Sequence, residues 1–140
     1  GLRGVAQITI VNRTPQRGQE LVDLLNQRVG ITAELAAWNG DYQVDESTDL
    51  VINATSIGLG DPDARVPVDA DSLRGEMVVA DVVFNPPETV FLREAAEQGC
   101  TVLDGLGMLV NQGVIGFQIW TGVEPNATVM REALEEYLEL

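Results

Sequence analysis

The chain has 140 residues and a formal net charge of −14, from 22 acidic and 8 basic residues. This length allows one domain with a modest core. Binding to nucleic acid or to an anionic membrane requires a basic surface, so the charge argues against both kinds of partner. All eight basic residues are Arg, there is no His, and Cys100 is the single cysteine. We therefore expect no transition-metal site and no internal disulfide, and we predict a cytoplasmic protein because no signal peptide or membrane-spanning stretch is found.

Short apolar segments alternate with helical patterns in the first half of the chain. The β-branched run 5–11 predicts a strand that is buried on both faces. Thr14 and Pro15 are typical of a helix start, and Gly30 of its end. Residues 31–38 and 49–53 predict two more strands, with loops at 39–48 and 59–67.

The second half continues this alternation. Residues 77–84 predict the strongest strand, followed by a helix over 88–98 and a short strand over 101–103 that starts beside Cys100 in the core. A turn over 104–107 and helices over 108–120 and 128–137 complete the chain. Strands and helices joined by short loops indicate an α/β fold with a mainly parallel sheet.

Ligands of open parallel sheets bind at the carboxyl ends of the strands, so the residues after each strand form the candidate site. The first strand ends in Asn12-Arg13-Thr14, with Arg17 nearby. In a dinucleotide-binding sheet, the end of the second strand faces the adenosine ribose of the cofactor. An acidic residue there selects NAD, whereas Arg accommodates the 2′-phosphate of NADP. Two guanidinium groups at a helix start could clamp that phosphate. The alternative is a solvated turn whose arginines pair with surface acids.

The later strand ends carry weaker signals. Thr55 and Ser56 are small enough to let a cofactor approach, but they are also ordinary turn residues. Asp81, within an apolar strand, needs hydrogen-bond partners, and we predict that it anchors a turn. Gly105 and Gly107 would let the backbone pass close to a flat ring.

Five stretches in this order resemble the carboxy-terminal half of shikimate dehydrogenase: ITIVNRTPQR, DLVINATSIG, ADVVFNPPET, GLGMLVNQG and FQIWTGVEP. The match runs from about residue 4 to about residue 138. Enzymes of that family reduce 3-dehydroshikimate to shikimate with NADPH, in the pathway to chorismate and the aromatic amino acids. The resemblance implies that residues 1–140 form a single Rossmann-type NADP-binding domain.

The resemblance also implies roles for individual residues. The family's motif for the 2′-phosphate and adenosine falls on Asn12, Arg13, Thr14 and Arg17, and further cofactor contacts fall on Thr55, Ser56, Val82, Gly105 and Met108. Two residues would face the substrate. Gln112 matches a glutamine that hydrogen-bonds a substrate hydroxyl, and Phe84 stands where the family commonly has Tyr.

Two departures from the family limit what the chain is expected to do. The family opens this domain with a strand, a glycine-rich turn and a helix, and the chain begins at Gly1-Leu2-Arg3-Gly4-Val5, where that helix would be ending. We therefore expect the sheet to lack its first strand, and we predict that the exposed edges cause dimerisation, element swapping or marginal stability. The family's catalytic Lys and Asp lie in an amino-terminal domain that we also expect to be absent.

Three functions follow as hypotheses. The chain is predicted to be the NADP-binding half of a shikimate dehydrogenase, with little or no turnover alone because it contains no Lys. The first alternative is a relative acting on quinate or another hydroxy acid, for which Phe84 is the hint. The second is a non-catalytic nucleotide-binding or interaction module.

Overall fold

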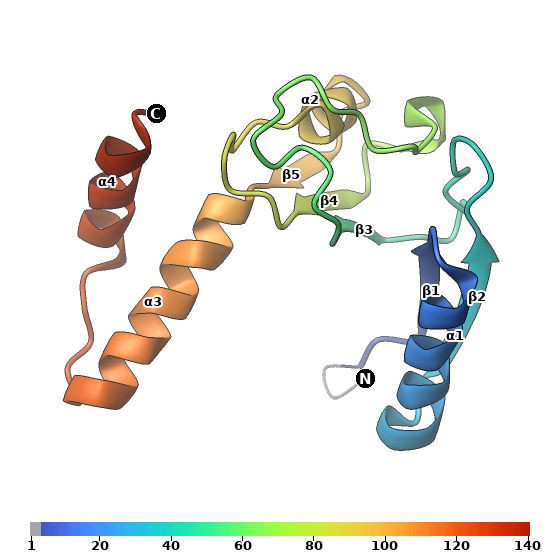
Figure 1. The fold of residues 1–140 in the computed structure, drawn as a ribbon, viewed down its shortest axis with the longest axis horizontal. Helices are drawn as coiled ribbons and strands as arrows, with labels where there is room; N and C mark the ends of the chain where they lie inside the picture. Colours follow the sequence, from blue (N-terminus) through green and yellow to red (C-terminus); the bar gives the residue numbers. More distant parts are fainter. Residues whose placement is uncertain (1–3) are drawn as a thin grey trace. The chain divides into compact units, whose positions relative to one another are not determined.

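A computed structural model of the protein describes residues 4–140, which fold into two compact units, with the boundary in the chain between Tyr42 and Gln43. Each unit combines parallel strands with helices (Figure 1). Gly1, Leu2 and Arg3, on which part of the expected helix end falls, lie outside the described residues.

The first unit is one βαβ unit. Strand β1 (Gln7–Asn12) leads into helix α1 (Pro15–Leu24), which continues as a π-helical turn over Leu25–Val29 and ends at Gly30 with a φ of 69°. Strand β2 (Thr32–Ala37) then pairs with β1 in parallel, from Gln7 opposite Thr32 to Asn12 opposite Ala37. All three predicted elements are confirmed.

The predicted double-sided burial of β1 is wrong. None of its six residues is fully buried. Within this unit β1 has one strand neighbour and contacts one helix, α1, so much of its surface remains open to solvent. The apolar run was therefore a correct signal for a strand but not for its surroundings.

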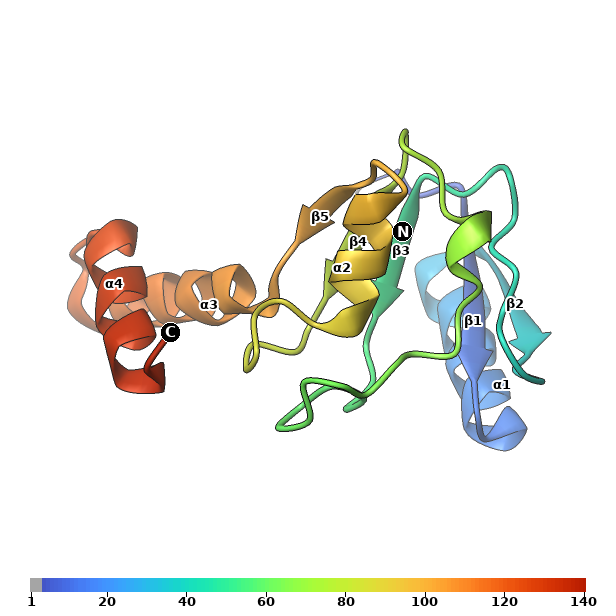
Figure 2. The same ribbon diagram turned by 90° about the horizontal axis from the view of Figure 1, so that it is seen from above.

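The second unit begins with a three-stranded parallel sheet in the order β3-β4-β5. The strands are β3 (Leu50–Asn53), β4 (Val78–Asp81) and β5 (Thr101–Leu103), and a short 3-10 helix, Ala70–Ser72, lies between the first two. Helix α2 (Val90–Glu97) lies along β4 and β5 (Figure 2). Its residues Phe91 and Ala95 form the core with Met77 and Val79, and Cys100 is buried, as predicted.

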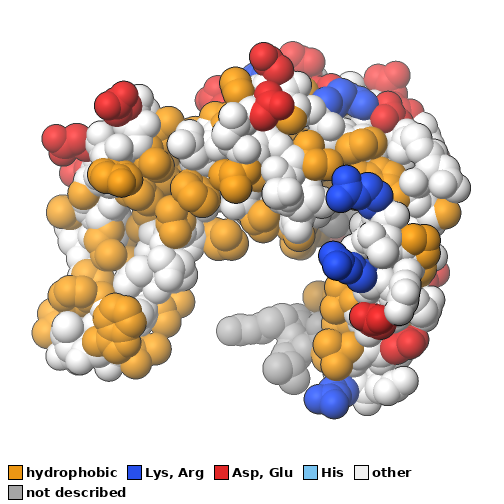
Figure 3. Space-filling view, viewed as in Figure 1, with side chains coloured by type: hydrophobic (Ala, Val, Ile, Leu, Met, Phe, Trp, Pro, Cys, Tyr) orange, Lys and Arg blue, Asp and Glu red, His pale blue; other side chains and the backbone are white. Residues whose placement is uncertain are grey.

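Two long helices complete this unit. Helix α3 (Gly105–Thr121) and helix α4 (Ala127–Leu138) run side by side (Figures 1 and 2). Figure 3 shows apolar side chains gathered over them, and Ile119 and Trp120 are among the most exposed. Within the described residues, no helix combines the length and apolar character needed to cross a membrane.

Two element boundaries differ from the predictions, and side chains explain both. Strand β4 ends at Asp81 rather than at residue 84, because the Asp81 carboxyl group accepts a hydrogen bond from the backbone N–H of Val83 at 2.9 Å and turns the chain. Helix α3 begins at Gly105, so the predicted turn over 104–107 is wrong. Asp104 caps this helix by accepting from the backbone N–H of Gly107 at 2.8 Å.

The five strands found in residues 4–140 form two sheets rather than one. Every pairing is parallel, which confirms the α/β class, but in residues 4–140 β1 pairs only with β2, and β3 only with β4. Each of these strands thus has an unpaired edge, as expected. Dimerisation or swapping through such edges stays a prediction.

Candidate functional site

The turn after β1 is open to solvent. The backbone N–H of Thr14 donates to Asn12 Oδ1 at 2.8 Å, which closes a small local turn before α1. Thr14 has the backbone conformation of a helix N-cap, but its side chain makes no capping hydrogen bond. Arg13 and Arg17 are both exposed beside this helix start. The four predicted clamp residues therefore lie together at an uncapped helix N-terminus, which favours an anion.

A hollow adjoins this turn. Its volume is about 190 Å³, and it is lined by Asn12, Pro15, Leu35, Ala36 and Ala37 at the carboxyl ends of β1 and β2. Of the clamp residues, only Asn12 lines it. Its largely apolar lining suits a flat or aliphatic group more than a charged one.

The turn after β3 is closed by its own side chains. Asn53 Oδ1 accepts from the backbone N–H of Thr55 at 3.1 Å and from the Thr55 hydroxyl at 2.7 Å. Thr55 Oγ1 in turn accepts from the backbone N–H of Ile57 at 3.1 Å. The Thr55 hydroxyl is thus used within the turn, whereas Ser56 is exposed.

The end of β4 is joined to this turn by a buried carboxyl group. Asp81 Oδ1 accepts from Asn53 Nδ2 at 3.0 Å, and Asp81 Oδ2 accepts from the Thr89 hydroxyl at 2.8 Å. This confirms the prediction that Asp81 anchors a turn. Val82 and Phe84, which follow it, are half-buried.

The start of α3 lies against the end of β4. A Cβ atom on Gly105 would come within 2.3 Å of the Val83 carbonyl oxygen and 2.6 Å of that of Val82. Such contacts are impossible without backbone movement, so only glycine fits here. Met108 is exposed one turn later, and Gln112 Nε2 donates to the Leu109 carbonyl oxygen at 2.9 Å within its own helix.

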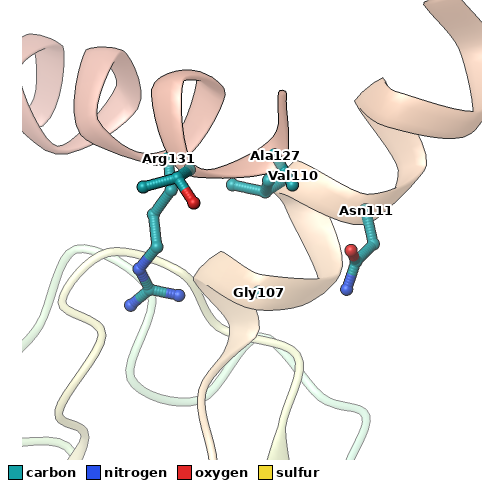
Figure 4. Close-up of a pocket in the computed structure, with 6 residues that line it drawn as sticks. Gly107, Val110, Asn111, Ala127 and Arg131 are labelled. Atoms are coloured by element: carbon teal, nitrogen blue, oxygen red, sulfur yellow. The ribbon is translucent and has the colours of Figure 1, made fainter. Parts of the chain in front are cut away.

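Between α3 and α4 lies a cavity of about 240 Å³ that no sequence motif had indicated (Figure 4). Arg131, in its lining, donates to Asp104 Oδ2 at 3.0 Å and to Glu135 Oε1 at 2.8 Å. Partial burial opposes ionisation of Asp104, but its hydrogen bonds from Arg131 and from the Gly107 N–H outweigh this and lower its pKa. The carboxylates of Asp104 and Glu135, which accept its hydrogen bonds, raise the pKa of Arg131.

The predicted site residues thus fall into two groups. Asn12, Arg13, Thr14 and Arg17 surround the turn of the first unit. In the second unit, Thr55, Ser56, Val82 and Phe84 follow the carboxyl ends of β3 and β4, and Gly105 lies against the same edge. Sequence reasoning missed Thr89 and Arg131. An Asn-Pro-Pro-Glu-Thr stretch before an amphipathic helix could have suggested Thr89 as a helix cap.

Sequence comparisons match this chain to shikimate dehydrogenases. Residues 105–135 match the model of the shikimate 5′-dehydrogenase C-terminal domain. A shikimate dehydrogenase (NADP(+)) of Methanopyrus kandleri is 40% identical over 138 residues, which cover 96% of this chain and 48% of that protein.

Solved structures share the fold. A ligand-free 5-ketofructose reductase of a Gluconobacter strain matches with a TM-score of 0.94 and 52% identity, over 97% of this chain and 49% of that one. A shikimate dehydrogenase in complex with NADP+ matches with a TM-score of 0.81 and 31% identity, over 95% and 55%. The chain thus spans about half the length of the relatives that it matches.

Proposed function

Because this chain corresponds to the carboxy-terminal, NADP-binding portion of the shikimate dehydrogenase family, we propose that it is the cofactor-binding half of an NADP-dependent oxidoreductase. One observation carries this proposal: the turn Asn12-Arg13-Thr14 combines an uncapped helix start with two exposed guanidinium groups, Arg13 and Arg17.

These residues fit the 2′-phosphate of NADP. The free N–H groups at the start of α1 would donate to its oxygens, and the two Arg side chains would neutralise its charge. Asn12 stands where NAD-selecting domains carry an acid, so no carboxylate would repel the phosphate. The local charge of the turn opposes the net charge of −14 of the chain.

Residues that follow β3 and β4 are proposed to contact the nicotinamide half. Thr55 and Ser56 lie along one strand end, and Val82, Gly105 and Met108 lie at the next strand end and the start of α3. Bound NADPH would supply the hydride that reduces a ketone. Phe84 and Gln112 would contact the substrate, with Gln112 first exchanging its bond to Leu109. We expect little turnover from the chain alone, because it contains no Lys to move the proton.

The substrate has two candidates. The first is shikimate and its 3-dehydro form, because the curated relative is a shikimate dehydrogenase. The second is a keto sugar, because a 5-ketofructose reductase has the higher identity, 52%, and because Phe84 removes a hydroxyl that the shikimate family commonly has.

Two measurements test these proposals. Calorimetric titration of the chain should give a lower Kd for NADP than for NAD, by about tenfold, because the guanidinium contacts are charge-assisted. A preference for NAD would contradict the proposed clamp. Steady-state assays of a full-length parent enzyme with shikimate, quinate and 5-ketofructose would then identify the substrate class.

A further inference from the structure

We infer that Asp81 is a positioning residue, which holds the turn after β3 and the segment after β4 in one fixed arrangement. The inference rests on the proposed function for what these segments bind. It concerns the buried cluster of Asn53, Asp81 and Thr89, whose side chains bond one another at the edge of the β3-β4-β5 sheet.

The first step is the burial of this cluster. Asp81 is 3% exposed, Asn53 4% and Thr89 2%. In residues 4–140 no ion pair to Asp81 is found, and its three partners are an amide, a hydroxyl and a backbone N–H. A buried carboxyl group is costly unless its oxygens are hydrogen-bonded, and here both oxygens accept.

The second step is that the three partners belong to different segments. Asn53 begins the turn that contains Thr55, and its Oδ1 accepts both hydrogen bonds from that residue. The N–H of Val83 lies between Val82 and Phe84. Asp81 therefore fixes Thr55, which is proposed to line the cofactor. It also fixes Val82 and Phe84, which are proposed to lie beside the nicotinamide and the substrate.

The third partner, Thr89, connects Asp81 to helix α2. The Thr89 hydroxyl donates to Asp81 and accepts from the backbone N–H of Leu92 at 3.3 Å, so it caps α2. Gly58, at the far end of the turn after β3, packs on Thr89: a Cβ atom there would lie 3.3 Å from Thr89 Cγ2. Both ends of this turn are thus held, one by Asp81 through Asn53 and the other by Thr89.

A core role alone does not explain a carboxyl group at this place. Replacing a buried ionisable group with a well-packed apolar residue is often neutral or stabilising, so its value lies in the geometry that its bonds fix. The apolar core of this unit includes Met77, Val79, Phe91 and Ala95, and Asp81 is joined to it by the backbone N–H of Val83, which is also buried.

The test uses two ligands that differ in reach. 2′,5′-ADP carries only the adenosine end proposed for the Asn12–Arg17 turn, whereas NADP also carries the nicotinamide, which is proposed to contact Val82 and Gly105. Asp81→Ala should weaken NADP binding by about tenfold or more and change 2′,5′-ADP binding by less than about twofold. Asp81→Asn, which keeps an acceptor for Asn53 and Val83, should fall between wild type and Asp81→Ala. It also provides the measurement if Asp81→Ala does not fold.

Asp45→Ala is the matched control. Asp45 also closes a local turn, by accepting from the Ser47 N–H at 2.8 Å, but it is exposed on a loop and should leave both affinities unchanged. Equal losses for NADP and 2′,5′-ADP in the Asp81 variants, or no loss for either, would overturn the inference.

Hydrogen exchange separates this inference from the proposed function. If the wild-type chain binds NADP no better than 2′,5′-ADP, the proposed function fails for the second unit. The positioning role is then decided by the amides of Thr55 and Val83, which should exchange faster in Asp81→Asn than in Asp45→Ala. Unchanged exchange at both amides would contradict it.

Discussion

Two turns with the same pattern, one in each unit, have opposite surroundings. Asn12-Arg13-Thr14 follows β1 and Asn53-Ala54-Thr55 follows β3, and in both the Asn Oδ1 accepts from the Thr N–H, at 2.8 Å and 3.1 Å. Asn12 remains partly exposed, whereas Asn53 is 4% exposed and donates to Asp81. The same Asn–Thr hydrogen bond forms both turns. Only the turn after β3 is also bound by a residue of the neighbouring strand, Asp81.

The helix starts show the same difference. The helices of the second unit are each capped by a side chain, from Thr89, Asp104 and Asn126, whereas Thr14 makes no such bond to α1. An uncapped start leaves N–H groups for a ligand, and a capped start gives rigidity. We therefore regard the first turn as a binding surface and the second as a frame.

The largest expected effect comes from adding a negative charge to the turn after β3, next to Asp81. Asn53→Asp would place a second carboxyl group about where Asn53 Nδ2 lies, 3.0 Å from Asp81 Oδ1. The new group would face Asp81 with a like charge and without the N–H donor that Asn53 provides, so we expect a loss of about 2–4 kcal/mol in the free energy of unfolding at pH 7. Urea denaturation followed by circular dichroism would measure it.

The open turn after β1 supplies the comparison. Asn12→Asp, at the open turn, should change stability by less than about 0.5 kcal/mol. Similar losses in both variants would contradict the comparison.

Glycine contacts give the next effect. Gly105→Ala would drive a Cβ atom into the Val83 carbonyl oxygen, and we expect it to cost about 1–3 kcal/mol. In the first unit Gly18→Ala meets the Leu35 side-chain end at 2.4 Å and Asn12 Cβ at 3.2 Å. Since a side chain can rotate away, its cost should be smaller.

The control for this pair is Gly107→Ala. The atom nearest to the added Cβ would be Asp104 Oδ1 at 3.4 Å, an ordinary contact inside a helix, so stability should be unchanged or slightly higher. Thermal unfolding of the three variants would rank them. If Gly105→Ala proved as stable as Gly107→Ala, the close approach of Gly105 to the Val83 carbonyl group would be contradicted.

The sequence alone predicts the elements of this fold better than the contacts between them. The strands and helices were predictable because apolar periodicity and helix-end residues such as Pro15 and Gly30 are local signals. The turn role of Asp81 was also predictable, since a polar residue in an apolar strand needs partners. Its link to Thr89 joins residues on different elements, and nothing in the local pattern specifies it.

Boundaries and strand surroundings were less predictable for related reasons. The start of α3 depends on whether the Asp104 side chain turns back to the Gly107 N–H, a choice that propensity does not decide. The exposure of β1 depends on how many elements cover it, which a period of apolar residues cannot report. The single domain predicted over residues 1–140 stays a prediction.

The turn after β1 can be tested by cofactor binding. Arg13→Ala and Arg17→Ala should each raise the Kd for NADP by about tenfold and change the Kd for NAD little, because only NADP carries the 2′-phosphate. Arg28→Ala is the control, since it removes an exposed Arg of the same unit at the far end of the helical segment. Equal weakening of NAD and NADP would show that the two arginines do not recognise the 2′-phosphate.

The smallest effect concerns the capped start of α3. Arg131 binds the capping carboxylate of Asp104 at 3.0 Å, whereas no side chain caps the start of α1. Because this pair is about one-third exposed, Arg131→Gln should cost only about 0.5–1 kcal/mol at pH 7. The lowered pKa of Asp104 means that this contribution is present above the unfolded pKa and is lost as the pH falls through the folded one. The difference between Arg131→Gln and wild type in urea should therefore shrink as the pH falls below the unfolded-state pKa of Asp, about 3.9, and Arg28→Gln should show no such pH-dependent difference. A difference that persisted in acid would mean that Arg131 stabilises α3 and α4 by packing, and that the capped start of α3 owes little to its charge.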